Sequence, residues 1–306
     1  MTYTRRVTLG LAAAAALLAA SGAADAQDWK ARYKEIQWSV IPAENATGVT
    51  ERFGPMMAYM SKELGVPVKL RVANDYAAVI EGQRAGQIHV AYYGPAALAR
   101  ALKTGVKTEA FAQDVNEDGT KGYYAVFYVR KDSPYQTIQD LKGKNLGLVD
   151  PNSMSGYNVP LYTLDKLQID PVKFFGKMVT TGSHENAVLA LQQGTVDVAA
   201  NWWNDERESN LLRMARKNMV KAEDFRIILK SDIIVNSPYA YLANLPADMK
   251  AAISTAFLAM PTKDPAAFAK ATDGKAKPWE AVTNDAFKPV VELITFVDNL
   301  KKKQTN

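Results

Sequence analysis

Residues 145–158 read Asn-Leu-Gly-Leu-Val-Asp-Pro-Asn-Ser-Met-Ser-Gly-Tyr-Asn, a short apolar strand followed by a tight turn with two hydroxyls and a glycine. The pattern predicts a helix from Ser155 to Leu167 directly after this turn. The first N–H groups of a helix lack an internal partner, and the helix dipole places partial positive charge beside them. The turn is therefore suited to an oxyanion, with Ser153 and Ser155 as O–H donors and Gly156 allowing close approach of the backbone.

Strands and helices alternate on both sides of this turn, which is typical of sheets covered by helices on both faces. Before the turn, the sequence predicts strands at 38–41, 66–72, 88–92, 106–113 and 123–130, with helices at 49–64, 76–85 and from 95 onward. After it, we expect strands at 177–181, 195–201 and 225–230, with helices at 185–193, 205–217, 247–259 and 284–301.

Two such runs predict an α/β fold of two lobes, with mostly parallel sheets and a cleft between the lobes. Without its leader the chain has about 280 residues, which is more than a single hydrophobic core usually supports and therefore also favours two domains. Strand-like hinge crossings near 124–130 and 232–240 are expected to join the lobes. The predicted division is 1–26 as a signal peptide, 27–125 together with 238–306 as lobe 1, and 126–237 as lobe 2.

Polar side chains follow the carboxyl ends of four predicted strands. They are Tyr76, Ser153, His184 and Asn204. In open α/β sheets, ligands bind beyond the carboxyl ends of the strands. This convergence favours an anion site over the alternative, an ordinary serine N-cap at the turn. No lysine follows the glycine of the turn, which excludes a nucleotide P-loop.

The first 26 residues have the pattern of a secretory signal peptide. Arg5 and Arg6 precede the apolar stretch 9–20, and the small-x-small triplet 24–26 marks a cleavage site. The arginine pair leaves both the general secretory route and twin-arginine export open. No other run reaches the about 20 apolar residues that a membrane helix needs. We therefore expect a periplasmic protein.

Composition narrows the chemistry. There is no cysteine, which excludes disulfides, thiolate metal sites and a cysteine nucleophile. The 37 Lys and Arg residues against 32 Asp and Glu give +5, or +4 without the leader, a mild excess that suits small anions but is too scattered for nucleic acid. His89 and His184 are far apart, so no metal-ligand spacing is present. We expect no metal, no cofactor and no enzymatic activity.

Five segments, in this order, resemble the substrate-binding proteins of phosphonate and phosphite ABC importers. They are Asp-Tyr-Ala-Ala-Val-Ile-Glu-Gly at 75–82, Gly-Tyr at 122–123, Asp-Pro-Asn-Ser-Met-Ser-Gly at 150–156, Gly-Ser-His-Glu-Asn at 182–186 and Val-Asp-Val-Ala at 196–199. The resemblance covers nearly the whole chain beyond the leader. It implies a type II periplasmic binding protein, expected to be a monomer, that closes on a small phosphorus oxyanion and delivers it to an inner-membrane permease.

The resemblance also implies the residues of the site. Phosphonate oxygens would lie on the turn, with two tyrosines as further contacts and the histidine as a further hydrogen-bond donor. The implied set is Tyr76, Tyr123, Ser153, Met154, Ser155, Gly156 and His184. Met154 stands where the family pattern has a threonine, which removes one hydroxyl and keeps a backbone N–H.

The far end of the implied site departs from the pattern more strongly. Asn204 and Ser237 stand where members that bind 2-aminoethylphosphonate have carboxylates for its amine, and Asp205 would substitute if the register differs. The adjacent Trp202 and Trp203 either pack inside a lobe or form an aromatic wall for the organic part of the ligand.

Two other functions stay open. A periplasmic phosphatase or phosphonate hydrolase would use Ser153 as a nucleophile, although no base lies at a known spacing and no Gly-x-Ser-x-Gly elbow is present. A protein that senses the same ligand for a membrane receptor would have the same site. The sequence also leaves the preferred phosphorus compound open.

Overall fold

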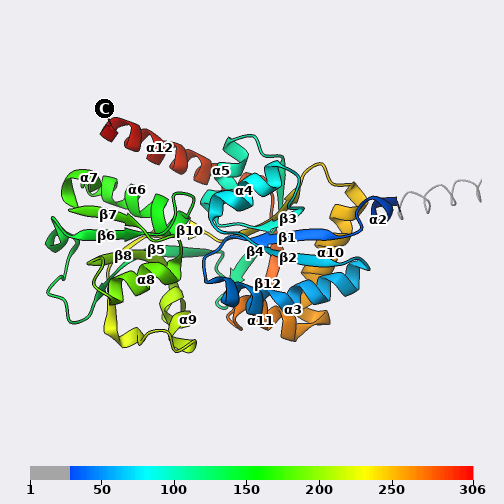
Figure 1. The fold of residues 1–306 in the computed structure, drawn as a ribbon, viewed down its shortest axis with the longest axis horizontal. Coiled ribbons are helices and arrows are strands. Elements are labelled where there is room, and N and C mark those ends of the chain that lie inside the picture. Colours follow the sequence, from blue (N-terminus) through cyan, green and yellow to red (C-terminus); the bar gives the residue numbers. More distant parts are fainter. Residues whose placement is uncertain (1–27, 306) are drawn as a thin grey trace, which may run out of the picture.

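The computed structural model describes residues 28–305, so the predicted signal peptide at 1–26 lies outside the described residues. Figure 1 shows two α/β lobes lying side by side along the long axis of the molecule. Each lobe has one sheet with helices on both faces. The predicted two-lobed α/β architecture is therefore confirmed. The prediction that the sheets are mostly parallel is wrong, because both sheets are mixed and antiparallel pairs outnumber parallel ones.

The sheet of the first lobe has six strands in the order β12-β4-β11-β3-β1-β2. Their bounds are Ile36–Val40 for β1, Val68–Val72 for β2, Val90–Tyr92 for β3, Thr108–Asn116 for β4, Pro238–Leu242 for β11 and Ala276–Ala281 for β12. β1 runs parallel to β2 and β3, whereas β11 is antiparallel to both β3 and β4. The sheet is mixed because β11 returns from the second lobe and enters in the opposite direction.

The sheet of the second lobe is mixed in the same way, with the order β10-β5-β8-β6-β7 and β9 paired to β8. Its strands are Gly122–Arg130 for β5, Asn145–Leu148 for β6, Lys177–Thr180 for β7, Val198–Asp205 for β8, Glu208–Ser209 for β9 and Phe225–Val235 for β10. β6 is parallel to β7 and β8, while β5 is antiparallel to β8 and β10.

Helices cover both sheets (Figure 1). The first lobe has α2 (Asp28–Arg32), α3 (Ala46–Leu64), α4 (Tyr76–Arg84), α5 (Pro95–Lys103), α10 (Ala247–Lys263) and α11 (Pro265–Thr272). The second has α6 (Val159–Lys166), α7 (Pro171–Phe174), α8 (His184–Gln192) and α9 (Asn210–Arg216). Short helical turns lie at η1 (Ile138–Leu141), η2 (Met154–Asn158), η3 (Ala222–Asp224) and η4 (Asn284–Phe287).

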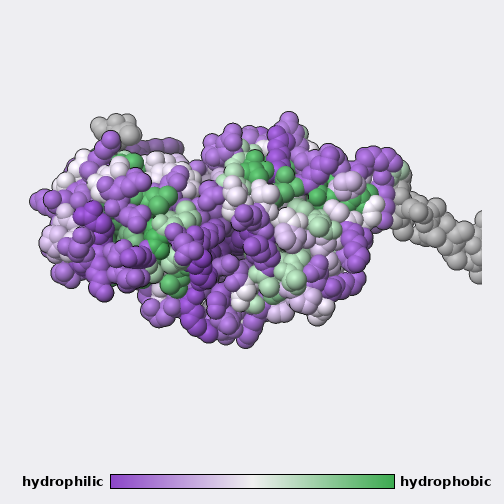
Figure 2. Space-filling model, turned by 60° about the horizontal axis from the view of Figure 1, so that its bottom comes forward, coloured by the Kyte–Doolittle hydropathy of each residue, from purple (hydrophilic) through white to green (hydrophobic). Residues whose placement is uncertain are grey.

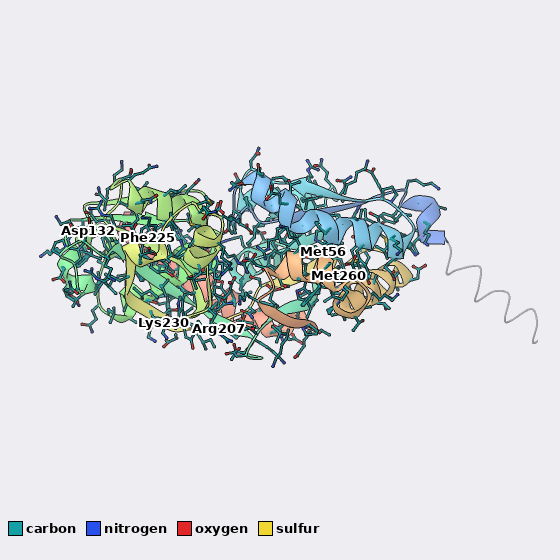
Figure 3. The ribbon with its side chains drawn as sticks, turned by 90° about the horizontal axis from the view of Figure 1, so that it is seen from below. Met56, Asp132, Arg207, Phe225, Lys230 and Met260 are labelled. Carbon is teal, nitrogen blue, oxygen red and sulfur yellow. The ribbon has the colours of Figure 1, made fainter. Side chains whose placement is uncertain are left out.

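The core of the first lobe is rich in aromatic side chains. Phe257 stacks on Trp279 with ring centroids 4.1 Å apart and lies 4.5 Å from Tyr239. Such ring pairs contribute about 0.5–1.5 kcal/mol beyond the area they bury. Met56 of α3 and Met260 of α10 are fully buried in the same core, on the right of Figure 3. This packing makes the first lobe a rigid support for the loops that face the second lobe.

One predicted helix, 205–217, is wrong at its start. β8 continues to Asp205, because Trp202 and Trp203 pair with β5 through Ala125 and Tyr124. The carboxylate of Asp205 then accepts the N–H groups of the second and third residues after it, at 2.7 and 3.0 Å, and closes a hairpin into β9. Aspartate favours such turns. The acidic pair 205–206 therefore marks a turn, and α9 begins only at Asn210.

The helix predicted from Ser155 begins with a π-helical turn, η2, before α6. The N–H of Asn158 bonds the carbonyl oxygen of Ser153, five residues earlier, at 3.1 Å. Wide turns of this kind are rare and occur frequently at functional sites.

The chain passes between the sheets at residues 117–121 and again at 236–237. The first passage precedes the expected range 124–130, because all of β5 belongs to the second sheet. The last helix, α12 (Lys288–Thr305), contacts both lobes. It packs on α5 of the first lobe, where Asp298 pairs with Arg100, and its Val297 lies in the core of the second lobe.

Candidate functional site

A cavity of about 120 Å³ lies between the lobes and is lined by side chains from both. A single water needs only about 10–15 Å³, so the cavity has room for a small molecule. Hydrophilic side chains surround the hollow between the lobes in Figure 2. Eight predicted site residues line this cavity: Tyr76, Tyr123, Ser153, Met154, Ser155, His184, Asn204 and Ser237. Gly156 and Asp205 do not.

The turn after β6 is held by local hydrogen bonds. Ser153 accepts the N–H of Gly156 on its hydroxyl at 3.0 Å, as an N-cap. Asp150 stabilises the turn through two hydrogen bonds. Its carboxylate accepts the N–H of Asn152 at 2.7 Å, and its backbone carbonyl accepts the N–H of Ser153 at 2.7 Å. Ser153 and Ser155 are both buried. Met154 and Ser155, the first residues of this helical run, line the cavity and are held in a fixed geometry.

Gly156 has a packing role. A Cβ atom placed there would lie 2.4 Å from the Cβ of Val149 and 2.8 Å from the hydroxyl of Ser153. Only glycine lets the turn lie this close to the end of β6, so Gly156 shapes the site without bordering the cavity.

Tyr76 is the first residue of α4, whose N-cap Asp75 accepts the N–H of Ala78 at 2.7 Å. Its side chain is 1% exposed, and its hydroxyl, which lies beside that of Ser153, forms no hydrogen bond of good geometry among residues 28–305. A buried polar group without a partner costs about 1–3 kcal/mol. Burial raises the pKa of Tyr76, so the hydroxyl remains protonated. The cavity thus contains a protonated, buried hydroxyl that no strong hydrogen bond among residues 28–305 satisfies.

Tyr123 reaches the cavity from the start of β5 and is nearly buried. Burial raises the pKa of Tyr123, so it too keeps its proton. Of the two neighbouring tyrosines that end β3, Tyr92 lines the cavity, whereas Tyr93 is fully buried and donates to Gln83 at 3.0 Å.

His184 is the first residue of α8 and is 4% exposed. Its Nδ1 lies 3.0 Å from the side-chain oxygen of Asn201, and its Nε2 lies 3.4 Å from the hydroxyl of Ser153. Burial lowers the pKa of His184 to about 4, although the bond to Asn201 opposes this shift. The imidazole is therefore neutral near pH 7. The other histidine, His89, accepts a backbone N–H at 3.0 Å and has a structural role.

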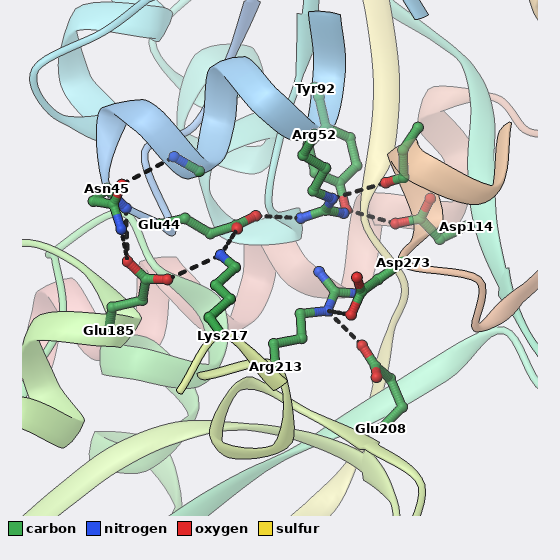
Figure 4. A network of polar contacts seen from close by, with 12 residues as sticks. Glu44, Asn45, Arg52, Tyr92, Asp114, Glu185, Glu208, Arg213, Lys217 and Asp273 are labelled. Atoms are coloured by element: carbon green, nitrogen blue, oxygen red, sulfur yellow. Dashed lines mark hydrogen bonds and ion pairs between the residues drawn. The ribbon is translucent and has the colours of Figure 1, made fainter. Parts of the chain in front are cut away.

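Charged side chains connect the lobes at the edge of the cavity (Figure 4). Lys217 of the second lobe lies 2.5 Å from Glu44 of the first and 3.1 Å from Glu185. The backbone and side-chain nitrogens of Asn45 both donate to Glu185 at 2.8 Å. Burial alone would raise the pKa of Glu44, but the charges of Arg52, Arg213 and Lys217 outweigh it and lower that pKa to about 2.

The far end of the cavity holds charged residues that the sequence did not indicate. Asp114 of β4 accepts the hydroxyl of Tyr92 at 2.6 Å and the indole N–H of Trp279 at 2.9 Å. Burial raises the pKa of Asp114. Arg213 of α9 binds Glu208 through its Nε, and Arg52 of α3 pairs with Glu44. These residues lie on separate elements, and no local pattern connects them before folding.

The two tryptophans have different surroundings. Trp202 lines the cavity, and the guanidinium of Arg213 lies over its ring at 4.8 Å. Trp203 does not line the cavity and packs on Tyr124, with Lys230 over its ring at 4.8 Å. Of the two tryptophans, only Trp202 can therefore contribute to an aromatic wall, and Arg213 covers one of its faces.

Ser237 lies in the second passage between the lobes, and Asn204 lies on β8, where it contacts Asn116 at the start of the first passage. The side-chain amide of Asn204 donates to Asn116 at 3.1 Å, and Asn236 donates to the same oxygen at 3.1 Å. Amides thus occupy this part of the cavity, and Asp205 is turned into its hairpin. Among residues 28–305, no cluster of three or more His, Cys, Asp or Glu is arranged to hold a metal ion, and no helix has the length and apolarity to cross a membrane.

A two-lobed fold with a polar cavity between the lobes defines the class of periplasmic binding proteins. A family model described as "ABC transporter, phosphonate, periplasmic substrate-binding protein" matches residues 38–287, and the chain belongs to this family. The family consists of binding proteins and not of enzymes, so the expectation that this chain has no enzymatic activity is confirmed.

Individual relatives agree with this assignment. The chain is 33% identical over 230 residues to the phosphonates-binding periplasmic protein of Escherichia coli (strain K12), covering 74% of this chain and 66% of that protein, slightly under two thirds of its length. A binding protein component of a phosphonate ABC transporter from Pseudomonas aeruginosa has a TM-score of 0.77 at 30% identity, covering 87% of both chains. PhnD1 of Prochlorococcus marinus (MIT 9301), solved with methylphosphonate, has the same fold, with a TM-score of 0.77 at 20% identity, covering 87% of this chain and 98% of that one. The predicted type II fold is confirmed.

Proposed function

We propose that this protein is exported through its leader at 1–26 and captures a phosphonate or phosphite between its lobes in the periplasm. It then delivers the ligand to an ABC permease in the inner membrane, and it acts as a monomer without metal, cofactor or nucleic acid. The observation that carries the proposal is that the buried hydroxyl of Tyr76, beside the serine turn and inside a cavity of ligand size, is not satisfied by any strong hydrogen bond among residues 28–305.

The oxyanion end has several donors that need an acceptor. The hydroxyls of Tyr76 and Ser155 and the N–H groups at the start of η2 would bind phosphonate oxygens, and Met154 would contribute its backbone N–H. Tyr123 and His184 would complete this end from β5 and α8. Hydrogen bonds to a charged group contribute about 1.5–3 kcal/mol each, so a few of them account for a dissociation constant near micromolar, or about −8 kcal/mol.

The opposite end would hold the organic part of the ligand between Trp202, Asn204 and Ser237. Gly156 would act through packing of the turn. We do not include Asp205 among the proposed contacts, because its carboxylate closes the β8–β9 hairpin.

Calorimetry against phosphite, methylphosphonate, 2-aminoethylphosphonate, phosphate and sulfate tests the proposal. At least one phosphorus ligand should bind at a single site without turnover. The absence of binding heat and of a thermal shift with every phosphorus ligand would contradict it.

A serine variant with a matched control tests the site itself. Ser153→Ala and Ser155→Ala should each weaken binding roughly ten- to a hundredfold, since each removes a bond to a charged group. Ser209→Ala is the control, because Ser209 is also a buried serine N-cap but does not line the cavity. Parent-like binding by both turn variants would mean that the turn is only a helix cap.

A further inference from the structure

The protonation of His184 can be read from the hydrogen bonds of its neighbour Asn201. The side-chain oxygen of Asn201 accepts the backbone N–H of Trp202 at 2.9 Å, and its side-chain nitrogen donates to the carbonyl of His184 at 2.9 Å. If the side-chain amide of Asn201 were flipped, its NH₂ group would face the N–H of Trp202, and two donors would oppose each other. The orientation of this amide is therefore fixed. The atom that faces Nδ1 of His184 is therefore an acceptor, and Nδ1 carries the proton.

The imidazole has no acidic partner that would add a second proton. It lies at the N-terminus of α8, where the helix dipole disfavours a cation. Charged residues on the elements around it are Glu185 on α8, Glu44 in the facing loop, Asp150 in the turn, Asp205 on β8, Arg213 and Arg216 on α9, and Lys217 directly after α9. Both Glu185 and Glu44 are paired with Lys217, and none of these residues forms an ion pair with His184 among the described residues. Nε2 therefore keeps its lone pair.

Nε2 faces the oxyanion end of the cavity. It lies 3.4 Å from the hydroxyl of Ser153, which in this tautomer donates to Nε2, and both residues line the cavity. A ligand P–OH would replace this long contact and leave the Ser153 hydroxyl free to donate to a ligand oxygen. A tetrahedral anion on the serine turn would meet donors on most sides and one acceptor at Nε2.

We propose that His184 accepts a hydrogen bond from the ligand, so that the site takes phosphorus oxyanions that still carry one proton and discriminates against sulfonates, which carry none. This specificity rests on the proposed function. A phosphonate monoanion has one P–OH group that fits the acceptor, and the second proton of such groups dissociates near neutral pH, at about 6 for a phosphate ester. A sulfonate would bring an oxygen lone pair against the lone pair of Nε2.

The alternative for a sulfonate is to protonate His184. With a pKa of about 4, this costs roughly a thousandfold in affinity at pH 7, because each pKa unit is a factor of ten. Methanesulfonate and methylphosphonate have the same methyl group and a similar tetrahedral head, so they form a matched pair that differs mainly in the proton.

The test measures both dissociation constants by calorimetry between pH 5 and pH 9. Methylphosphonate should bind with nearly constant affinity below its second pKa and weaken about tenfold per pH unit above it. Methanesulfonate should bind at least a hundredfold more weakly at pH 7 and improve as the pH falls. Equal binding of the two ligands at pH 7, or phosphonate binding that is independent of pH, would overturn the inference.

Two further measurements make the outcome specific. Nitrogen NMR of the imidazole in the methylphosphonate complex should show a proton on Nδ1; a doubly protonated ring with the ligand as dianion would refute the acceptor role. His184→Gln, whose amide can donate, should narrow the gap between the two ligands. If no phosphorus ligand binds the parent, the proposed function fails. If methylphosphonate binds and methanesulfonate binds equally well, only this inference fails.

Discussion

Replacing Lys217 with methionine should weaken ligand binding by removing a charge that connects the lobes. Its ammonium lies 2.5 Å from Glu44 of the first lobe and 3.1 Å from Glu185 of the second. Only the pair with Glu44 crosses the cleft, so its free energy is gained when the lobes come together. The substitution removes this term and leaves most of the hydrophobic stem.

The expected magnitude follows from the surroundings of the pair. Two unit charges about 3 Å apart interact by about 5 kcal/mol at an effective dielectric constant of 20. Desolvation offsets much of this, and the Lys217 side chain is 34% exposed, so solvent screens it further. Glu44 keeps Arg52, and Glu185 keeps two donors from Asn45. The substitution should therefore reduce the free energy of ligand binding by about 1–2 kcal/mol, which raises the dissociation constant roughly 5- to 30-fold.

Calorimetry with methylphosphonate at fixed pH and salt measures this effect, and urea unfolding of the free protein monitors stability. Lys230→Met is the matched control, because Lys230 lies over Tyr124 and Trp203 within the second lobe. The control should bind like the parent. If Lys217→Met also binds like the parent, the interlobe pair contributes nothing to closure and the electrostatic argument is wrong.

Three other outcomes are expected. In competition, 2-aminoethylphosphonate should bind less than 100-fold more tightly than methylphosphonate, because Asn204 and Ser237 stand where other members have carboxylates for the amine. A larger preference would contradict this, and its loss in Asp114→Asn would identify Asp114 as the partner of the amine. The pKa of Glu44 is lowered from 4.5 to about 2, so its ionised form stabilises the fold above pH 4.5 and this contribution disappears as the pH falls toward 2; urea unfolding at pH 3 and 5 should show a smaller difference for Glu44→Gln than for the parent. Gly156→Ala should cost about 1–3 kcal/mol and lower the melting temperature, because the new Cβ meets Val149; an unchanged melting curve would contradict the packing role.

The side chains of the proposed oxyanion end could be grouped from sequence because their signals are local. The turn, its serines and the start of the next helix lie within a few residues, and Tyr76 and His184 each begin a helix after a strand. In an α/β sheet, such positions meet at one edge whatever the details of packing.

The opposite end could not be predicted, for two physical reasons. Asp114, Arg213 and Arg52 come together only through the closure of two lobes, and each alone resembles an ordinary surface charge. The hairpin at Asp205 was missed because strand pairing of Trp202 and Trp203 extends β8 beyond the apolar run that marks it. Tertiary pairing outweighed the local helix pattern.

We expect the C-terminal helix α12 to restrict how the two lobes separate, because it contacts both of them. It lies along the top of Figure 1, in contact with both lobes, whereas α3, α9 and α11 lie along the bottom. A helix that contacts both lobes on one side of the molecule should limit their separation to a rotation about that side. The distance between fluorophores on α9 and α11 should therefore change strongly when a ligand binds. The distance between fluorophores on α5 and α12 should stay constant, so this second pair would be the internal reference in a sensor built from this chain.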